Sequence, residues 1–338
     1  MAWYNVKPRE GDVVISSRVR LARNVSGYPF GKRLSAEGAN EIISRVGEAL
    51  GDAFVRTDMT SLSREKAASL VEQHLISRDF AAAKGPHALF SNDNKSVYVM
   101  ACEEDHIRVQ CILPGLAIED AFRFAEECDN ALDAALPIAF DEQLGYLTHC
   151  PTNLGTGMRA SVMLFLPALT EAGQIPALAQ KLSKLGLTMR GIYGEGSQSA
   201  GYLYQVSNQI TLGPTEEELI AKLSEALRSI IEKERALRGN ISEEAAERRA
   251  DRIHRAEGIA RYATLLSSEE FFRLFADLKL GIATGVITTL SHEALQTMLI
   301  HSQPATLSLG EDIQANGAFA RDRARASFIR KALEVSNA

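Results

Sequence analysis

The sequence predicts an α+β protein in which an antiparallel sheet, flanked by helices, is followed by a smaller all-helical C-terminal domain. Up to residue 239, several segments alternate between apolar and polar residues, as strands with one buried face do. These segments do not follow the regular β-α-β rhythm of a parallel sheet. After residue 240, apolar residues recur at helical spacing almost throughout. We therefore predict two domains, residues 1–239 and residues 240–338.

The first predicted strand covers residues 13–21, where β-branched residues recur at every second position. One face of it would carry Val13, Ile15, Ser17, Val19 and Leu21, and the other Ser16, Arg18 and Arg20. A strand at residues 96–100 follows an Asn-Asp-Asn-Lys turn and is predicted to continue through residues 103–113. Residues 158–166 and 202–212 are predicted to form two further strands.

Helices are predicted where apolar residues recur every three to four positions. In the first domain they cover residues 36–50, 63–74, 118–136, 175–185 and 215–238. Ser63 is placed to cap the second of these, and Thr215 with Glu218 forms a capping box at the last. In the C-terminal domain, turns are expected near Ser267-Ser268, Gly281, residues 302–304 and Gly317.

Composition argues against several classes of protein. The formal net charge of −6 disfavours generic binding of nucleic acid, which favours basic proteins. No apolar run approaches the roughly 20 residues of a membrane span, and the N-terminus lacks the apolar core of a secretion signal. A cytoplasmic location is therefore expected. The four cysteines, Cys102, Cys111, Cys128 and Cys150, form no C-x-x-C pair, and free thiols are expected rather than disulfides or a zinc site.

Common catalytic motifs are absent from the chain. It contains no G-x-x-x-x-G-K-[ST] loop, no H-R-D or D-F-G segment, no H-E-x-x-H and no G-x-S-x-G. P-loop NTPases, ordinary protein kinases, helical zinc proteases and α/β-hydrolases are thereby disfavoured.

A few polar residues could instead build a phosphate-handling site. Arg18 and Arg20 would project together as a polyphosphate clamp, although a solvated strand face would have the same pattern. On a strand, Glu104 would share a polar face with Arg108, as in an ordinary surface ion pair or a catalytic one. Cys150 opens a loop with two glycines, where a reactive thiol or a small core residue would both fit. Four glycines in residues 191–201 predict a mobile loop around Glu195, whose carboxylate could equally be a solvated one.

Several segments resemble, in order, the signatures of the ATP:guanidino phosphotransferases. They are SSRVR at residues 16–20, EEDHIR at 103–108, CPTNLGTGMRASV at 150–162, RGIYGEG at 190–196 and YQVSNQITLG at 204–213. Within this family the chain is similar to the bacterial protein arginine kinases. The resemblance implies a phosphagen-kinase-like catalytic domain in the first part of the chain.

The resemblance also implies roles for individual residues. The nucleotide site would comprise Ser16, Ser17, Arg18, Val19, Arg20, His74, Arg108, Arg159, Ala160, Ser161, Val162, Met163, Arg190, Gly191, Ile192, Tyr193, Gly194 and Glu195. Its arginines would grip the ATP phosphates, and His74 would lie near the base. Glu104 and Glu195 would hold the acceptor guanidinium, with Cys150 beside it. Mg²⁺ would be held by the nucleotide phosphates, with no dedicated protein ligand.

The C-terminal domain contains a second motif of these kinases. Their R-D-x-x-R-A sequence binds phosphoarginine as an allosteric signal, and the resemblance assigns this role to Arg321, Asp322, Arg325 and Ala326. Two positions depart from the family pattern. Cys102 replaces the usual Asn and is expected to retune the acceptor pocket, and Gln198 stands where a Glu is common.

We therefore expect a protein arginine kinase that uses ATP, marking proteins for degradation or regulating a stress response. The partners implied are protein substrates, an activator protein, a Clp-type unfoldase or protease, and further copies of the chain. One alternative is a small-molecule arginine kinase, but the helical domain that precedes the catalytic domain in such enzymes would not fit before Ser16. The other is a non-catalytic phosphoarginine-binding adaptor, against which the intact Glu104, Cys150 and Glu195 argue.

Overall fold

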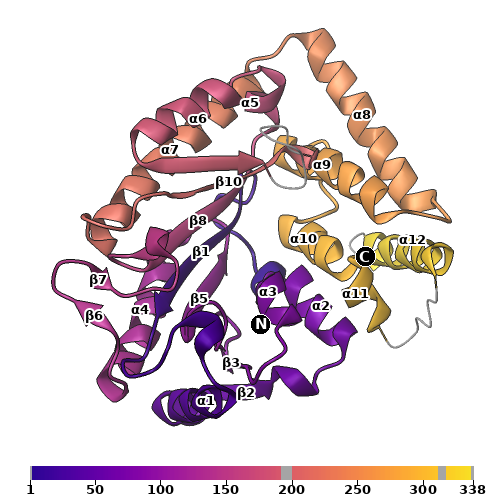
Figure 1. Ribbon diagram of the computed structural model, residues 1–338. Helices are drawn as coiled ribbons and strands as arrows, with labels where there is room; N and C mark the ends of the chain where they lie inside the picture. The colour runs from indigo at the N-terminus through magenta and orange to yellow at the C-terminus, as the bar shows by residue number, and fades with distance from the viewer. Residues whose placement is uncertain (1, 192–199, 311–316, 336–338) are drawn as a thin grey trace.

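A computed structural model describes residues 2–191, 200–310 and 317–335. Its centre is an eight-stranded sheet in the order β2-β3-β4-β5-β1-β8-β10-β9, in which all neighbouring strands are antiparallel (Figure 1). The strands are β1 (Val14–Arg23), β2 (Phe54–Asp58), β3 (Ala88–Asn92), β4 (Val97–Ala101), β5 (Ile107–Pro114), β8 (Met158–Phe165), β9 (Leu187–Gly191) and β10 (Leu203–Asn208). A separate hairpin pairs β6 (Phe140–Asp141) with β7 (Gly145–Tyr146). The predicted α+β architecture is confirmed.

Seven helices accompany the sheet in the first part of the described chain: α1 (Ala36–Leu50), α2 (Arg64–Glu72), α3 (Arg78–Ala82), α4 (Ile118–Ala135), α5 (Pro167–Glu171), α6 (Ile175–Lys184) and α7 (Glu216–Gly239). The described C-terminal part is helical: α8 (Glu243–Tyr262), α9 (Ser268–Thr284), α10 (His292–His301), α11 (Pro304–Ser308) and α12 (Ala318–Val335). The capping roles predicted for Ser63 and for Thr215 with Glu218 are confirmed. None of the described helices has the length and apolar composition that a bilayer crossing requires.

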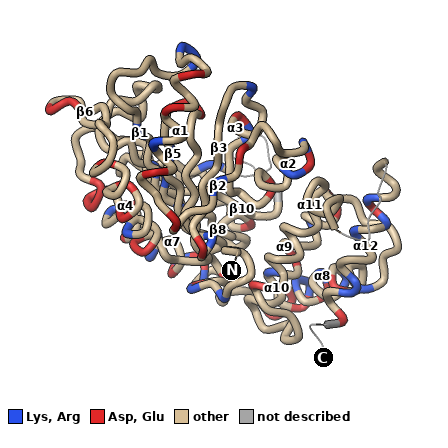
Figure 2. Tube along the Cα trace, turned by 90° about the horizontal axis from the view of Figure 1, so that it is seen from below, with Lys and Arg blue, Asp and Glu red and all other residues tan. Residues whose placement is uncertain are grey.

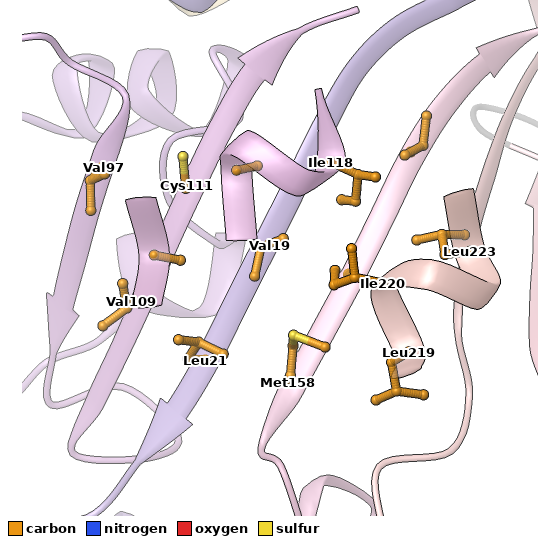
Figure 3. Packing of buried hydrophobic residues seen from close by; sticks show 14 of the residues in the cluster. Val19, Leu21, Val97, Val109, Cys111, Ile118, Met158, Leu219, Ile220 and Leu223 are labelled. Carbon is orange, nitrogen blue, oxygen red and sulfur yellow. The ribbon is translucent and has the colours of Figure 1, made fainter. Parts of the chain in front are cut away.

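One face of the sheet is covered by α1, α4 and α7. Val19 and Leu21 of β1 and Val109 of β5 point from the sheet towards Ile118 of α4 and Leu223 of α7 (Figure 3). These side chains belong to a continuous buried cluster, whose burial supplies the main stabilisation of this layer. The alternation of β1 leaves its arginines on the opposite face.

The other face of the sheet shares a core with the C-terminal helices. Ile15 and Phe165 from the sheet lie in one buried cluster with Phe271, Leu295 and Ile329 from the C-terminal part. The two parts are therefore packed together through apolar surface. The division into domains at residues 239 and 240 stays a prediction.

A partly buried contact between a carboxylate and the backbone reinforces this packing. Glu72, the last residue of α2, accepts hydrogen bonds from the backbone N–H groups of Ala305 and Thr306, at 2.8 and 2.7 Å, and from the Thr306 hydroxyl at 2.7 Å. These N–H groups open α11 and would otherwise lack acceptors. The end of α2 is thus tied to the C-terminal helices.

Some sequence predictions were wrong in detail. A register shift between Val14 and Ser16 in the pairing with β8 turns Ile15 away from Val19 and onto the opposite face. Gly281 does not mark a turn, because α9 continues to Thr284; a Cβ on Gly281 would collide with Ile253 and Ile287, so the glycine permits close helix packing.

Two strand predictions also needed correction. Residues 103–106 do not form a strand but the tight turn between β4 and β5, in which Cys102 N–H bonds to the His106 carbonyl at 2.8 Å. Strand β10 ends at Asn208, earlier than predicted, because the Asn208 side-chain amide donates to the Met158 and Ile210 carbonyls and turns the chain away from the sheet.

Lys279 of α9 is a buried lysine whose ammonium donates to the Gly11 carbonyl at 2.6 Å. Burial lowers its pKa to about 7, against the opposing effect of Asp12. Between pH 7 and pH 10.5, the unfolded chain therefore binds a proton that the folded chain has lost, and this group makes stability rise with pH in that window. Outside it, the contribution of Lys279 is constant.

We expect Lys279→Met to weaken the rise of protein stability with pH between pH 7 and 10. The difference in unfolding free energy between variant and wild type should change by up to about 1.4 kcal/mol per pH unit between pH 7 and 10. Denaturant titrations across that range measure it. Lys233→Met, at an exposed position of α7, is the matched control and should leave the slope unchanged. Parallel slopes for Lys279→Met and wild type would contradict the assignment.

Candidate active site

Five arginines meet on the sheet face that α4 and α7 leave uncovered. They are Arg18 and Arg20 on β1, Arg108 on β5, Arg159 on β8 and Arg190 on β9. Arg20 lies directly opposite Arg159 in the β1–β8 ladder and opposite Gln110 in the β1–β5 ladder. Like charges at directly opposite positions destabilise a sheet, so this arrangement requires a compensating partner.

The cluster has more positive charge than the carboxylates of the described residues neutralise. Burial, together with the charges of Arg159 and Arg108, lowers the pKa of Arg18 to about 10. Burial and three neighbouring arginines also lower the pKa of Arg20. The Nε atoms of Arg18 and Arg159 are buried without a hydrogen-bond partner among the described residues. Unpartnered buried donors are costly, so the site fits an anion with several oxygens, such as a polyphosphate.

His74 lies at the edge of this cluster, just after α2. Its backbone has a φ of +62°, which is uncommon for a residue with a side chain. The Gln110 side-chain amide holds that conformation by donating to the carbonyls of His74 and Leu75, each at 3.0 Å. Burial and the charge of Arg18 lower the pKa of His74 to about 4, so its imidazole is neutral at pH 7. A neutral ring beside the arginines can pack against a nucleotide base without adding charge.

The turn between β4 and β5 brings carboxylates to the arginines. Arg108 forms an ion pair with Glu103 and a second, longer one with Glu104 at 3.4 Å. The Glu103 side chain is only 5% exposed and also accepts a hydrogen bond from Ser77, whereas that of Glu104 is 42% exposed. Glu104 is therefore the carboxylate that an incoming group can reach.

The same turn is bonded to the loop that carries Cys150. The Asp105 carboxylate accepts hydrogen bonds from the His149 backbone N–H at 2.6 Å and from the Asn24 side chain at 2.7 Å. The Cys150 thiol lies 3.0 Å from the Thr152 hydroxyl. A Cβ on Gly155 or Gly157 would collide with the backbone of Thr211 or Ala22, and both glycines have positive φ. These glycines therefore allow the loop to pack closely.

The geometry thus places a cluster of arginines suited to phosphates next to the Glu104 carboxylate, on a turn that is bonded to the loop of the Cys150 thiol. Comparison with known families decides which chemistry this serves. Residues 40–237 match the family model described as the ATP:guanido phosphotransferase C-terminal catalytic domain, and residues 246–338 match that of the protein-arginine kinase McsB C-terminal domain. The chain belongs to the ATP:guanidino phosphotransferase family.

The curated relatives place it in the protein-arginine kinase branch of that family. A protein-arginine kinase of Desulforamulus reducens is 42% identical, covering 98% of this chain and 95% of the relative. One from Syntrophomonas wolfei is 43% identical, covering 99% and 96%. The chain is therefore an ATP:guanidino phosphotransferase of the protein-arginine kinase group, for which ATP is the phosphoryl donor.

Solved phosphotransferases of this family have the same fold. A duplicated taurocyamine kinase from Schistosoma mansoni, with bound transition-state-analogue components, aligns with a TM-score of 0.62 and 28% identity. The alignment covers 79% of this chain and 39% of that one. A lombricine kinase structure aligns with a TM-score of 0.60 at 23% identity, covering 70% and 73%. The second likeness supports the fold alone.

Several residues of the phosphotransferase signatures do not direct their side chains towards the arginine cluster. Val19, Ala160 and Val162 point into the core on the other face, and Ser17 is buried, donating to the Gly115 carbonyl at 2.8 Å. Ser16 and Ser161 are also buried, and Met163 is partly buried. The fully buried members of this set can contribute to a nucleotide site through their backbone or by supporting the arginines. Gly191 ends β9, whereas Ile192, Tyr193, Gly194, Glu195 and Gln198 lie outside the described residues.

The departure at Cys102 has a backbone explanation. Cys102 adopts a φ of +65°, a conformation that Asn tolerates better than most residues. Its sulfur lies 3.7 Å from the Ala39 carbonyl of α1, and burial raises the pKa of this thiol to about 12. Cys102 therefore faces α1 and does not retune the acceptor pocket through its side chain.

Sequence reasoning missed three residues that support the site. Glu103 and Asp105 were not singled out, because alternation along the predicted strand places them on the face opposite Glu104 and Arg108. Arg23 is buried, pairs with Asp129 at 2.7 Å and donates to the Thr156 carbonyl at 3.0 Å. It thereby fixes the Cys150 loop from beneath. Among residues 2–191, 200–310 and 317–335, no three His, Cys, Asp or Glu side chains are grouped to hold a metal ion.

Proposed function

We propose that this chain transfers the γ-phosphoryl group of ATP to the guanidinium group of arginine residues in proteins. The observation that carries this proposal is the group of mutually repelling arginines with unpartnered buried Nε atoms, next to the turn of Glu104 and the loop of Cys150. The relatives named protein-arginine kinases favour an arginine within a protein as the acceptor over a free guanidino compound.

In this reaction, a bond forms between an acceptor guanidinium nitrogen and the γ-phosphorus of ATP. The bond from that phosphorus to the β–γ bridging oxygen breaks, and ADP leaves. A protonated guanidinium is a poor nucleophile, so Glu104 orients it and accepts its proton. Cys150 lies beside the acceptor, and Glu195 is assigned to the second carboxylate contact from the family resemblance. The arginines stabilise the charge on the transferred phosphoryl oxygens.

Mg²⁺ is proposed to be bound by the nucleotide phosphates and water, where it neutralises charge. The arginine-rich donor set suits a metal–polyphosphate complex better than a bare cation.

The acid lability of the product tests this function. Incubation with γ-labelled ATP and a denatured protein should give label that is stable at neutral pH and released by mild acid, whereas phosphoserine would survive.

The Cys150→Ser variant tests the role of the thiol. It should fold normally and lose most turnover. Turnover within about twofold of wild type would remove Cys150 from the mechanism. Acid-stable label would contradict arginine phosphorylation itself.

The wider roles are proposed from the family resemblance. They are the marking of proteins for degradation or regulation of a stress response in the cytoplasm, with an activator protein and a Clp-type unfoldase or protease as partners. Self-association of the chain belongs to the same proposal. A phosphoproteome of the native host with and without this protein would identify the substrates.

A phosphoarginine site at α12 is proposed as the regulatory element. Arg325 is buried, and its guanidinium donates to the Ser302 and Leu266 carbonyls and to the Asp322 carboxylate, each at 2.8 Å. Ala326 is buried beside it. Arg321 lies one helical turn away and is partly exposed. We therefore assign the phosphate contact to Arg321 and a positioning role to Arg325.

This assignment predicts different outcomes for the two arginines. Arg321→Ala should abolish binding of free phosphoarginine, measured by calorimetry on the full chain, and leave the unfolding temperature unchanged. Arg325→Ala should lower stability by about 2 kcal/mol or more, because it leaves buried acceptors unpaired. Binding that survives Arg321→Ala, or no binding to wild type at millimolar ligand, would refute the site without affecting the catalytic assignment.

A further inference from the structure

We propose that an apolar surface beside the acceptor loop binds extended, cationic protein segments that carry apolar side chains next to the target arginine. This surface consists of Phe140, Leu144, Ile210 and Leu212, and we call it the acceptor rim. The inference rests on the proposed function and specifies which protein segments the site accepts.

The acceptor rim exposes large apolar side chains from two separate segments. Phe140 and Leu144, on the β6–β7 hairpin, are 58% and 43% exposed. Ile210 and Leu212, after β10, are 50% and 48% exposed. An isolated exposed apolar residue is ordinary, but several around one loop indicate an interaction surface.

Both segments are bonded to the loop that follows Cys150. From the hairpin, the Tyr146 N–H donates to the Gly155 carbonyl at 2.8 Å. From the other segment, the Thr211 hydroxyl donates to the carbonyls of Leu154 and Thr152, at 2.7 and 3.0 Å. The Thr156 N–H donates back to the Thr211 carbonyl at 2.9 Å. The rim residues therefore flank this loop on two sides.

The acceptor rim is continuous with the acceptor site itself. Thr152, whose carbonyl is bonded to Thr211, places its hydroxyl 3.0 Å from the Cys150 sulfur. A polypeptide that presents an arginine to Cys150 and Glu104 would have its neighbouring residues over the rim. Free arginine has no such neighbours and would gain nothing from it.

The rim is rigidly supported from below. The buried guanidinium of Arg23 lies 3.3 Å from the centre of the Tyr146 ring and donates to the Thr156 carbonyl. The Phe140 ring packs edge-on against the same tyrosine, with ring centres 5.2 Å apart. A surface fixed in advance loses little entropy on binding.

The charge around the rim complements a cationic segment. No Lys or Arg occurs between Arg123 and Arg159, a stretch with six acidic residues, or between Arg190 and Lys222. Acidic residues lie at the end of the β6 hairpin (Figure 2), where the sequence has Asp141 and Glu142. The phosphate side of the site is rich in arginine, whereas the two chain segments that form the rim contain no Lys or Arg, and the buried Arg23 beneath them is paired with Asp129. This asymmetry attracts an arginine-containing segment to the acceptor side.

An apolar surface selects for chains that are extended. In a folded protein, large apolar residues next to an arginine are mostly packed into that protein's own core. They become available together with the arginine when the segment is unfolded or extended. The combination of an apolar rim and acidic surroundings therefore favours such segments as acceptors.

The test compares two arginine peptides of equal length and charge. One has Leu and Phe beside its single arginine, and the other has Ser and Gly. For Ile210→Ser/Leu212→Ser, KM for the apolar peptide should rise about tenfold, given the apolar area lost. KM for the Ser/Gly peptide and for ATP should change less than about twofold. Leu144→Ser should have a smaller effect in the same direction.

Two control variants separate the contributions. Val55→Ser removes an apolar side chain that is 59% exposed on β2, at the far edge of the sheet, and should leave both peptides unaffected. Glu142→Gln should raise KM for both peptides at low ionic strength and lose its effect at high salt.

Equal KM values for the two peptides with wild type, or an unchanged preference in the double variant, would overturn the inference and leave arginine phosphorylation intact. Failure of wild type to phosphorylate any arginine peptide or protein would overturn the proposed function along with it. A double variant with altered oligomeric state but unaltered peptide preference would assign the rim to contacts between copies of the chain, which also overturns the inference.

Discussion

Arg20→Met is expected to lower the rate of phosphoryl transfer by about a thousandfold or more, the scale typical of an arginine that stabilises transferred phosphate. The same substitution should raise the unfolding temperature of the nucleotide-free protein by roughly 2–4 °C. Arg20 lies directly opposite Arg159, and the charges of Arg18, Arg108 and Arg159 all act against its own. Methionine removes this repulsion while filling a similar volume.

Thermal unfolding with and without ATP gives the decisive comparison. ATP should raise the unfolding temperature of wild type, because it binds the folded state, and should raise that of the variant much less. Arg56→Met, at an exposed position on β2, is the matched control and should change neither activity nor stability. An Arg20→Met variant that is inactive and also less stable would contradict this prediction. It would show that Arg20 stabilises the folded protein instead of serving mainly to bind an anion.

Glu104→Gln and Glu103→Gln are expected to differ in kind. Glu104→Gln should lower kcat by about a hundredfold or more, through loss of the general base. Its unfolding temperature should stay near that of wild type, because a half-exposed ion pair contributes little to stability. Glu103→Gln should instead destabilise the protein by roughly 1–3 kcal/mol, because Glu103 is the buried partner of Arg108 and Ser77.

The two variants distinguish a catalytic role, assigned to Glu104, from a structural role, assigned to Glu103, within one turn of the chain. Steady-state kinetics over pH, together with thermal unfolding, measure both effects. If Glu103→Gln loses more turnover than Glu104→Gln at full stability, the proton acceptor has been assigned to the wrong neighbour.

The local sequence was sufficient for most of the elements. The apolar spacing of residues 36–50 gave the bounds of α1, and Thr215 with Glu218 gave the start of α7, because helix periodicity and capping depend on residues within one or two turns. The alternation of β1 also separated Val19 and Leu21 from Arg18 and Arg20 before any partner strand was known. Family signatures then pointed to the arginines, Glu104 and Cys150.

Only the tertiary structure decided which of these groups are free to act. Arg321 and Arg325 look alike in the motif. The guanidinium of Arg325, however, already donates hydrogen bonds to backbone carbonyls of residues that lie 23 and 59 positions away in the sequence. Glu103 and Glu104 are adjacent, but a turn at Cys102 with positive φ buries one and exposes the other. Periodicity carries information about neighbours along the chain. The repulsion between Arg20 and Arg159 arises between strands that are distant in sequence, as does the burial that leaves Nε donors without acceptors. Both effects exist only once the sheet has formed.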